Sequence, residues 1–174
     1  LEAHKNGVEF ISVSPLRSDM IDDVDAAWLS IRPNSDAALM MWLCHVLLDE
    51  GLQDRAFLDR YCVGFDQFAE YLTGASDGIV KDASWAGAIC AMDAEAIKTL
   101  ARRMAKSRTM LSFSWSLTRQ AHGEQPFWAG ITLAALLVQI GLSGGRFGLV
   151  FLPVSSVVNP NQLVSLASIT LTNT

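Results

Sequence analysis

Two side chains that could bind a ligand lie close together near the middle of the chain, at Trp115 and Arg119. They follow a strand-like run over residues 110–115 and precede an apolar helix that we predict from Pro126 to about Ile140. Loops that directly follow strands carry most of the functional groups in open α/β sheets. An arginine can hold a phosphate or a carbonyl group through two parallel hydrogen bonds. We therefore predict that Trp115 and Arg119 belong to a ligand site.

A second set of polar residues follows the buried strand predicted over residues 8–13. Pro15 prevents the strand from continuing, so these residues stand just beyond its carboxyl end. They are Ser14, Arg17, Ser18 and Asp19. Rossmann-like folds bind nucleotides at this place, often through a side chain that contacts the ribose. An ordinary strand-to-loop turn would account for the same residues, and the sequence leaves both interpretations open.

A third set follows a short strand predicted over residues 26–31. Asn34, Ser35 and Asp36 stand at the start of a helix predicted over residues 36–50. Asn34 or Ser35 suits the N-cap, because its side-chain oxygen can accept a hydrogen bond from the first turn, and Asp36 suits the helix dipole. The helix is apolar nearly all round, which predicts burial between two layers.

The remaining elements are helices. We predict them over residues 54–61, 65–71, 82–90 and 93–106, with Asp82 and Asp93 as N-caps of the last two. Five aromatic residues recur at helical spacing, and we expect them in the core: Phe57, Tyr61, Phe65, Phe68 and Tyr71. The helix from Pro126 is shorter than the roughly 20 residues of a membrane span. A buried helix is favoured there, and no membrane span is expected.

The composition suits a packed protein and gives no support for nucleic-acid binding. Hydrophobic residues make up 51% of the chain, which is enough for a core, and the net charge is -5. Nucleic-acid binding needs a basic face. The cysteines at positions 44, 62 and 90 lack the paired spacing of a metal site, so buried free thiols are expected.

These elements predict a helix-rich α/β fold with a Rossmann-like, open, mostly parallel sheet flanked by helices. We divide the chain into a partial nucleotide-binding domain over residues 1–110, a strand–loop–helix segment over 111–148 that leads into a neighbouring domain, and an extended tail over 149–174. The tail is expected to find its partners in sequence beyond this chain. The opening residues read as the middle of a helix-to-strand connection, so we expect a fragment of a larger protein.

Four stretches carry more specific information. They are ISVSPLRSD, IRPNSDAALMMWLCHVLLDEGLQDRAFLDRYCVGFDQFAEYLTG, SDGIVKDASWAGAIC and SWSLTRQAHGEQPFWAGITLAALLVQIGLSGGRFG. They cover residues 8–148 in unbroken order, and the runs YCVGFDQF and HGEQ are the most distinctive. In these stretches the chain resembles molybdopterin enzymes of the dimethyl sulfoxide reductase family. The resemblance is strongest to the branch that reduces S-oxides and N-oxides, such as dimethyl sulfoxide, trimethylamine N-oxide and biotin sulfoxide.

The resemblance implies a bis(molybdopterin guanine dinucleotide) molybdenum cofactor held between the α/β domains of a multidomain enzyme. The implied cofactor-binding residues are Ser14, Pro15, Ser18, Asn34, Ser35, Asp36, Trp115, Arg119 and His122. The first three match the segment after a strand that meets the guanosine, and the next three match a polar triplet that contacts the nucleotide. The tryptophan and the arginine match positions that reach the pterin, while the histidine falls on a run expected to support the site. Two positions depart from the family pattern, because Ser14 replaces an acidic residue or Asn and Arg146 replaces a third glycine.

The implied activity is removal of an oxygen atom from a small S-oxide or N-oxide, with an electron-donor protein or reduced nicotinamide as the partner. The family's protein ligand to the metal lies upstream of this segment, so we expect neither a metal ligand nor a catalytic residue here, and the chain alone is expected to be inactive. Two alternatives stay open: an enzyme with the same cofactor that acts on formate or nitrate, and a non-catalytic nucleotide-binding module. The bacterial compartment, periplasmic or cytoplasmic, stays open as well.

Overall fold

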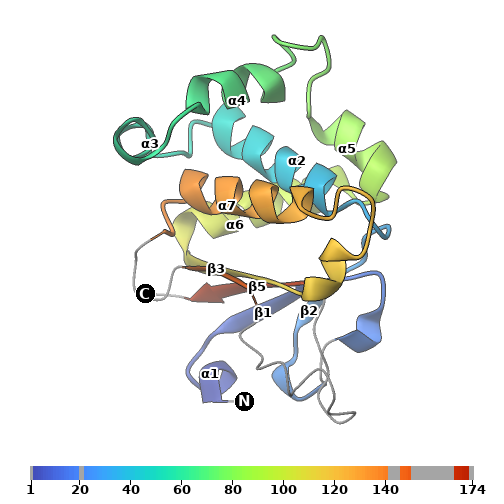
Figure 1. Cartoon of the computed structure of the whole chain (residues 1–174). Helices are drawn as coiled ribbons and strands as arrows, with labels where there is room; N and C mark the ends of the chain where they lie inside the picture. The colour runs from blue at the N-terminus through green and yellow to red at the C-terminus, as the bar shows by residue number, and fades with distance from the viewer. Residues whose placement is uncertain (1, 20–21, 141–145, 150–166, 173–174) are drawn as a thin grey trace.

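A five-stranded sheet forms the base of the molecule (Figure 1). The computed structural model describes residues 2–19, 22–140, 146–149 and 167–172. The strands are β1 (Glu9–Val13), β2 (Ala27–Leu29), β3 (Arg108–Phe113), β4 (Arg146–Leu149) and β5 (Ala167–Thr172), in the order β2-β1-β5-β3-β4. β1 pairs with β2 in parallel, β3 pairs with β4 in parallel, and β5 runs antiparallel to both β1 and β3. Four of the five strands therefore run in one direction, which confirms the predicted α/β fold with a mostly parallel sheet.

Strand β5 lies in the middle of the sheet, within the segment that the sequence predicts as an extended tail. Its backbone pairs with β1 from Glu9 to Ser12 and with β3 along the whole of that strand. The expectation that the tail finds its partners beyond this chain is therefore wrong for residues 167–172. The loose alternation of these residues indicates an extended strand but not its neighbours, because strand pairing depends on distant segments. The rest of the predicted tail, from residue 150 to 166 and beyond 172, lies outside the described residues.

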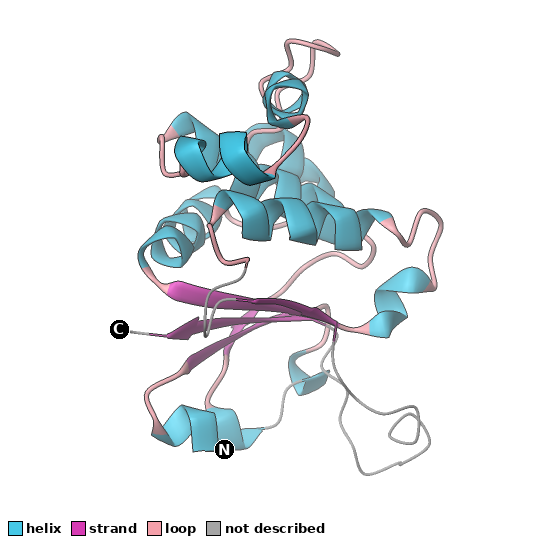
Figure 2. Ribbon diagram, turned by 60° about the vertical axis from the view of Figure 1, so that its left-hand side comes forward, coloured by secondary structure: helices cyan, strands magenta, loops and turns pink. Residues whose placement is uncertain are grey.

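The longer helices cover one face of the sheet, whereas the short helix α1 (Glu2–Lys5) lies on the opposite side (Figure 2). The helical layer contains α2 (Asp36–Asp49), α3 (Arg55–Tyr61), α4 (Phe65–Leu72), α5 (Ala83–Cys90), α6 (Ala94–Lys106) and α7 (Gln125–Leu136). The core forms where this layer meets the sheet residues Ile11, Val13, Leu111 and Phe113. Helix α2 is central, since eight of its residues are buried. This burial confirms the prediction from its all-round apolar sequence.

Several helix ends follow from local hydrogen bonds. The side chains of Asp82 and Asp93 accept hydrogen bonds from backbone N–H groups in the first turns of α5 and α6, which confirms both predicted N-caps. Helix α7 ends at Leu136, earlier than predicted, because Val138 adopts a left-handed conformation with φ 55°. The buried Gln139 side chain then accepts a hydrogen bond from the N–H of Thr109 at 3.2 Å. This contact joins the end of α7 to the start of β3.

The aromatic residues of α3 and α4 divide into two groups. Phe57, Phe65 and Phe68 are partly buried and pack against the core, as predicted. Tyr61 and Tyr71 are 64% and 39% exposed, so their prediction as core residues is wrong. Each of these rings instead lies against a cation, since a phenol ring can cover a charged group while its hydroxyl stays in water.

Lys81 closes the segment between α4 and α5. Its side chain is 2% exposed, and its ammonium group donates to the carboxylate of Asp77 and, at 2.6 Å, to the carbonyl of Ile79. The Nζ atom also lies 3.9 Å from the centroid of the Tyr71 ring. The buried charge is thus satisfied by two acceptors and an aromatic face.

Replacing Lys81 with Ala is expected to lower the free energy of unfolding by about 2–4 kcal/mol, because packing and charge-assisted hydrogen bonds are lost together. Lys81→Met keeps most of the volume and should fall between the two proteins. Urea unfolding of the chain measures both effects, with Lys106→Ala as an exposed control. A Lys81→Ala protein as stable as the control would show that the segment closes without this side chain.

The described residues were compared with the requirements of a membrane-spanning helix and of a metal-binding cluster of side chains. None of the helices in these ranges has the length and hydrophobicity needed to cross a bilayer. No group of three or more His, Cys, Asp or Glu side chains among them could hold a metal ion. Cys44 and Cys90 are buried and Cys62 is partly buried, all as free thiols.

Candidate functional site at the carboxyl edge of the sheet

The three predicted groups of site residues lie at one edge of the sheet. β1, β2 and β3 run in the same direction, so their carboxyl ends, at Val13, Leu29 and Phe113, meet at the same edge (Figure 1). The strand order places β5 between β1 and β3, which separates these two strands by roughly 10 Å. Parallel sheets bind ligands at this edge. The topology therefore brings together segments that are as far as a hundred residues apart in sequence.

The tip of β1 is organised by Ser14, which has no exposed surface. Its hydroxyl donates to the Asp19 carboxylate and accepts a hydrogen bond from the N–H of Leu16 at 3.2 Å. Its N–H donates to the carbonyl of Leu29, and its carbonyl accepts from the indole N–H of Trp28 at 2.9 Å. Every polar group of Ser14 thus has a partner within the protein. Ser14 holds the loop that a ligand would meet.

The residues after Ser14 are more accessible. Pro15 is partly buried, and the short 3-10 helix at Arg17–Asp19 exposes both Arg17 and Ser18. Among the described residues, the Arg17 guanidinium has no ion-pair partner. The tip of β1 therefore presents the hydroxyl of Ser18 and the unpaired positive charge of Arg17. The buried Ser14 holds the turn in place.

The loop after β2 is anchored to the end of α5. The N–H of Arg32 donates to the carbonyl of Cys90, and its guanidinium donates to the carbonyl of Ala88 at 3.1 Å. Ser35 occupies the N-cap position of α2, but its buried hydroxyl donates to the carbonyl of Arg32 and forms no cap. The predicted side-chain cap is therefore wrong. The hydroxyl closes the turn instead, and the exposed Asn34 in this turn adopts a left-handed conformation with φ 63°.

Asp36 carries the most unusual electrostatics of the three groups. Burial raises the pKa of its carboxyl above the ordinary value, and a hydrogen bond to its own backbone offsets this only in part. No cation among the described residues forms an ion pair with it. A partly buried carboxylate without a cation is a strong acceptor for the hydrogen-bond donors of a ligand.

The tip of β3 turns sharply after Phe113. Ser114 caps a 3-10 helix at Trp115–Thr118, since its hydroxyl accepts from the N–H of Ser116. Trp115 is 56% exposed, and Arg119 follows directly as an exposed residue. The Arg119 guanidinium has no ion-pair partner in the described parts of the chain. This tip thus offers a large aromatic ring and a second free positive charge.

His122 lies further along the same bend. Its side chain is 85% exposed, and its Nδ1 atom is 4.0 Å from the carboxylate of Glu124. Its φ of 57° is left-handed, which is uncommon for a residue other than glycine. The structure therefore places His122 on the surface of the bend, where its contacts with the rest of the chain are few.

Gly123 allows the bend to close. A Cβ atom at this position would lie 2.6 Å from the backbone oxygen of Thr118 and 2.7 Å from its carbonyl carbon. Because these are backbone atoms, the contact cannot be relieved by a side-chain rotation. The glycine is thus required by the close approach of two backbone segments.

Gly123→Ala is expected to lower the free energy of unfolding by about 1–3 kcal/mol, because the bend must open to accept the methyl group. Gly87→Ala is the matched control, since a Cβ at this position in α5 meets nothing nearer than 3.7 Å. Urea unfolding and limited proteolysis after Arg119 measure the two effects. A Gly123→Ala protein that resists cleavage as the parent does would contradict the tight closure of the bend.

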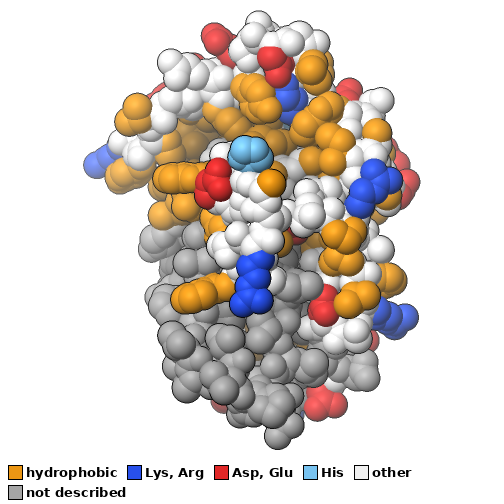
Figure 3. Space-filling model, turned by 45° about the vertical axis from the view of Figure 1, so that its right-hand side comes forward, with side chains coloured by type: hydrophobic (Ala, Val, Ile, Leu, Met, Phe, Trp, Pro, Cys, Tyr) orange, Lys and Arg blue, Asp and Glu red, His pale blue; other side chains and the backbone are white. Residues whose placement is uncertain are grey.

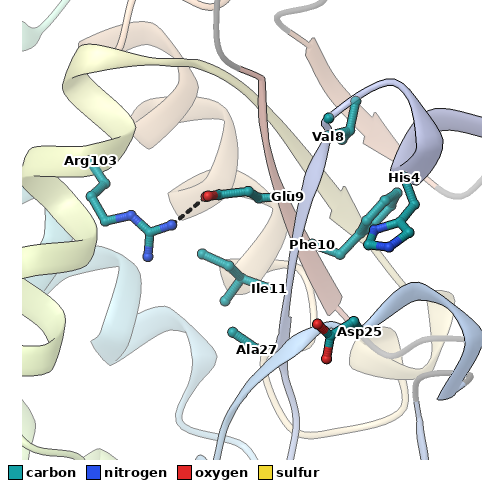
Figure 4. Close-up of a pocket in the computed structure, with 9 residues that line it drawn as sticks. His4, Val8, Glu9, Phe10, Ile11, Asp25, Ala27 and Arg103 are labelled. Carbon is teal, nitrogen blue, oxygen red and sulfur yellow. Dashed lines mark hydrogen bonds and ion pairs between the residues drawn. The ribbon is translucent and has the colours of Figure 1, made fainter.

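A cavity of about 360 Å³ lies at the opposite edge of the sheet and contains none of the predicted residues (Figure 4). His4, Glu9, Asp25 and Arg103 contribute its charged or polar side chains. Glu9 and Arg103 satisfy each other through an ion pair. The cavity lies at the amino ends of β1 and β2, whereas open parallel sheets bind ligands at the carboxyl ends. We therefore assign the site to the other edge.

On the face of the molecule shown in Figure 3, the charged side chains do not gather into a single patch. On the face shown in Figure 3, positive and negative side chains are interspersed, and hydrophobic side chains gather over the helical part. An anionic ligand would therefore meet individual arginines at the strand tips rather than a broad basic surface.

Sequence reasoning missed three contacts that hold the loops of this site. Trp28 donates to Ser14, Asp19 accepts from Ser14, and Arg32 ties the second loop to α5. Asp19 lies close to Ser14 in sequence and could have been recognised as a turn partner. The other two contacts join segments 14 and 56 residues apart, and no local pattern indicates them.

The sequence is similar to several bacterial reductases. It is 47% identical over 145 residues to the dimethyl sulfoxide/trimethylamine N-oxide reductase of Cereibacter sphaeroides, which covers 83% of this chain and 18% of the relative. It is 49% identical over 144 residues to the biotin sulfoxide reductase of the same organism, covering 83% and 19%. It is 48% identical over 139 residues to the trimethylamine-N-oxide reductase of Pasteurella multocida, covering 79% and 17%. The chain thus spans less than a fifth of the length of these relatives.

The fold is similar to part of a solved structure. Acetylene hydratase from Pelobacter acetylenicus superposes with a TM-score of 0.53 at 22% sequence identity, over 79% of this chain and 17% of that protein. The family model described as molybdopterin oxidoreductase matches residues 2–172. With this match and the three reductases, the chain belongs to the molybdopterin oxidoreductase family.

Proposed function

We propose that this chain forms part of the site for a bis(molybdopterin guanine dinucleotide) molybdenum cofactor, in an enzyme that removes oxygen from small S-oxides or N-oxides. Membership of the family supports a molybdopterin cofactor, and the names of the similar reductases support the substrate class. The observation that carries the guanine dinucleotide form is the unpaired, partly buried carboxylate of Asp36 at the carboxyl edge of the sheet.

The loop that follows β2 suits the guanine base. Guanine offers N–H donors at N1 and N2 side by side, and a carboxylate can accept both of them. Asp36 lies at the start of α2, after the turn that contains Asn34 and Ser35. The exposed amide of Asn34 can add a further contact, whereas the hydroxyl of Ser35 is already used within the turn. Discrimination of guanine from adenine follows, because adenine lacks the N1–H donor.

The bend that follows β3 suits the pterin end of the same ligand. The Arg119 guanidinium can bind a phosphate or a pterin carbonyl in a bidentate manner. Trp115, in the same bend, offers a large exposed ring that can cover a planar heterocycle. His122 adds an exposed ring nitrogen in the same bend that can donate to an anion.

In the proposed enzyme, the bound cofactor supplies oxygen-atom and electron transfer. The residues of this chain bind and orient it, and they leave the metal's protein ligand to sequence outside this chain. The electron donor would be a protein or reduced nicotinamide. The isolated chain is accordingly expected to bind nucleotide without reducing any oxide.

A chimera tests the proposal. The matching 145-residue segment of the Cereibacter sphaeroides dimethyl sulfoxide/trimethylamine N-oxide reductase is replaced by that of this chain. The chimera is expected to retain molybdenum and to reduce dimethyl sulfoxide or trimethylamine N-oxide. The matched control carries the same segment with Asp36→Ala and Arg119→Ala together. A folded chimera that holds no more molybdenum than this control would contradict the proposal.

A further inference from the structure

The turn after β1 is held in place by a cluster of polar contacts that no ligand-binding role explains. Ser14 is the centre of this cluster, and it receives the indole N–H of Trp28 at its carbonyl and directs its hydroxyl to Asp19. Trp28 belongs to the neighbouring strand β2, and the residue is 38% exposed. Its hydrogen bond to Ser14 therefore fixes the turn, although the residue is not buried in the core.

The cluster determines where Arg17 lies. Arg17 and Asp19 are the two ends of the short 3-10 helix, so the bond from Ser14 to Asp19 fastens this helix to the strand tip. The same bond occupies the Asp19 carboxylate, which would otherwise be the nearest anion in sequence for Arg17. The Arg17 guanidinium forms no ion pair within the described ranges. An exposed, unpaired guanidinium on a turn that is held in place can bind an anion.

Arg32 provides the contrast. It follows the next strand tip along the same edge, but its guanidinium donates to the carbonyl of Ala88 at the end of α5. Its charge therefore stabilises the carbonyl end of that helix. Of the arginines that follow β1 and β2, only Arg17 is free to meet an anion.

We infer that Trp28 and Asp19 are positioning residues that hold the turn after β1 so that Arg17 binds a phosphate group of the guanine dinucleotide. This inference rests on the proposed function, because the phosphate belongs to the ligand proposed for that site. Trp28 and Asp19 act through Ser14 and need not touch the ligand. Arg17 contacts the phosphate oxygens through its N–H groups.

The test compares guanosine with guanosine diphosphate as probes, by calorimetric titration of the 174-residue chain. The ratio of the two dissociation constants measures the gain in affinity that the phosphates provide. Arg17→Ala is expected to reduce this gain about tenfold and to leave guanosine affinity unchanged, because one charge-assisted contact is lost. The reduction should shrink at high salt. Arg60→Ala, an exposed arginine of α3, is the control.

The positioning role predicts a specific pattern among the variants. Trp28→Phe and Asp19→Ala should reduce the phosphate-dependent gain as far as Arg17→Ala does, and combining either with Arg17→Ala should add nothing. Asp19→Asn should restore most of the gain, since an amide oxygen can still accept from Ser14. A general loss of structure would instead weaken guanosine and guanosine diphosphate equally.

The failures can be told apart. Suppose that the parent chain binds guanosine and that Arg17→Ala, Trp28→Phe and Asp19→Ala all leave the phosphate-dependent gain in affinity unchanged. The inference is then wrong and the proposed function stands. If the parent chain binds neither probe, both are wrong. Equal weakening of both probes by Trp28→Phe and Asp19→Ala would also overturn the inference, because it would show a purely structural role.

Discussion

Replacing Asp36 with Asn is expected to lower the affinity of the chain for guanosine about tenfold to a hundredfold, while the fold is retained. The carboxylate accepts two donors from guanine, and hydrogen bonds to a charged group contribute about 1.5–3 kcal/mol. Calorimetric titration measures the loss. Asp49→Asn, at the exposed end of the same helix, is the matched control. In the complete enzyme, Asp36→Ala should lower molybdenum content with little change in unfolding, and parent-level molybdenum would contradict the guanine contact.

The carboxyl group of Asp36 also makes the free energy of unfolding depend on pH, in a direction that can be predicted. Burial raises the pKa of Asp36 in the folded chain, so the folded state binds a proton more tightly than the unfolded state. Stability from this group is present at acid pH and falls as pH rises from the ordinary value through the raised one. Asp36→Asn removes this dependence, so the variant should be at least as stable as the parent at neutral pH. A variant that is less stable at neutral pH would show that the carboxylate is paired.

Guanosine binding should have the opposite dependence. The donors of guanine favour the ionised carboxylate, so affinity is expected to rise as pH increases through the raised pKa of Asp36. The rise should be absent in Asp36→Asn. Titrations at a series of pH values measure it, and a parent chain whose affinity falls with pH in this window would contradict the assignment.

The second large effect is expected at Arg119. In the complete enzyme, Arg119→Ala should lower turnover about tenfold to a hundredfold, because a bidentate contact to the ligand is lost. Its effect on the free energy of unfolding should stay within about 0.5 kcal/mol, since the side chain is exposed and has no ion-pair partner in the described ranges. Steady-state kinetics and thermal unfolding of the same preparations measure the two quantities.

Arg119→Lys separates geometry from charge. Lysine keeps the positive charge but lacks the planar fork, so activity should recover only in part. Arg60→Ala is again the control for removal of an exposed arginine. Equal kinetic and thermal losses in Arg119→Ala would point instead to a structural arginine that supports the bend after β3.

Local patterns predicted the elements well where short-range chemistry determines them. Asp82 and Asp93 act as N-caps, and the apolar helix α2 is buried, because hydrogen bonds within one turn and a continuous apolar surface are both visible in sequence. The grouping of polar residues at one edge was also predictable, since the parallel direction of β1, β2 and β3 brings their carboxyl ends together.

Contacts between distant segments were not predictable. The indole N–H of Trp28, on the neighbouring strand, donates to the carbonyl of Ser14, and no local pattern indicates this contact. The position of β5 between β1 and β3 depends on pairing across more than fifty residues. The end of α7 depends on a left-handed Val138, which no residue preference indicates. The cofactor roles of individual residues, including Asp36 and Arg119, stay predictions.

The most direct test is the nucleotide content of the complete enzyme. Acid hydrolysis of the purified protein should release guanosine monophosphate, and metal analysis should find one molybdenum atom for every two such nucleotides. The Asp36→Ala enzyme should lose nucleotide and molybdenum together. Molybdenum accompanied by no guanine nucleotide, or by another nucleotide, would contradict the claim that this edge of the sheet binds the guanine dinucleotide.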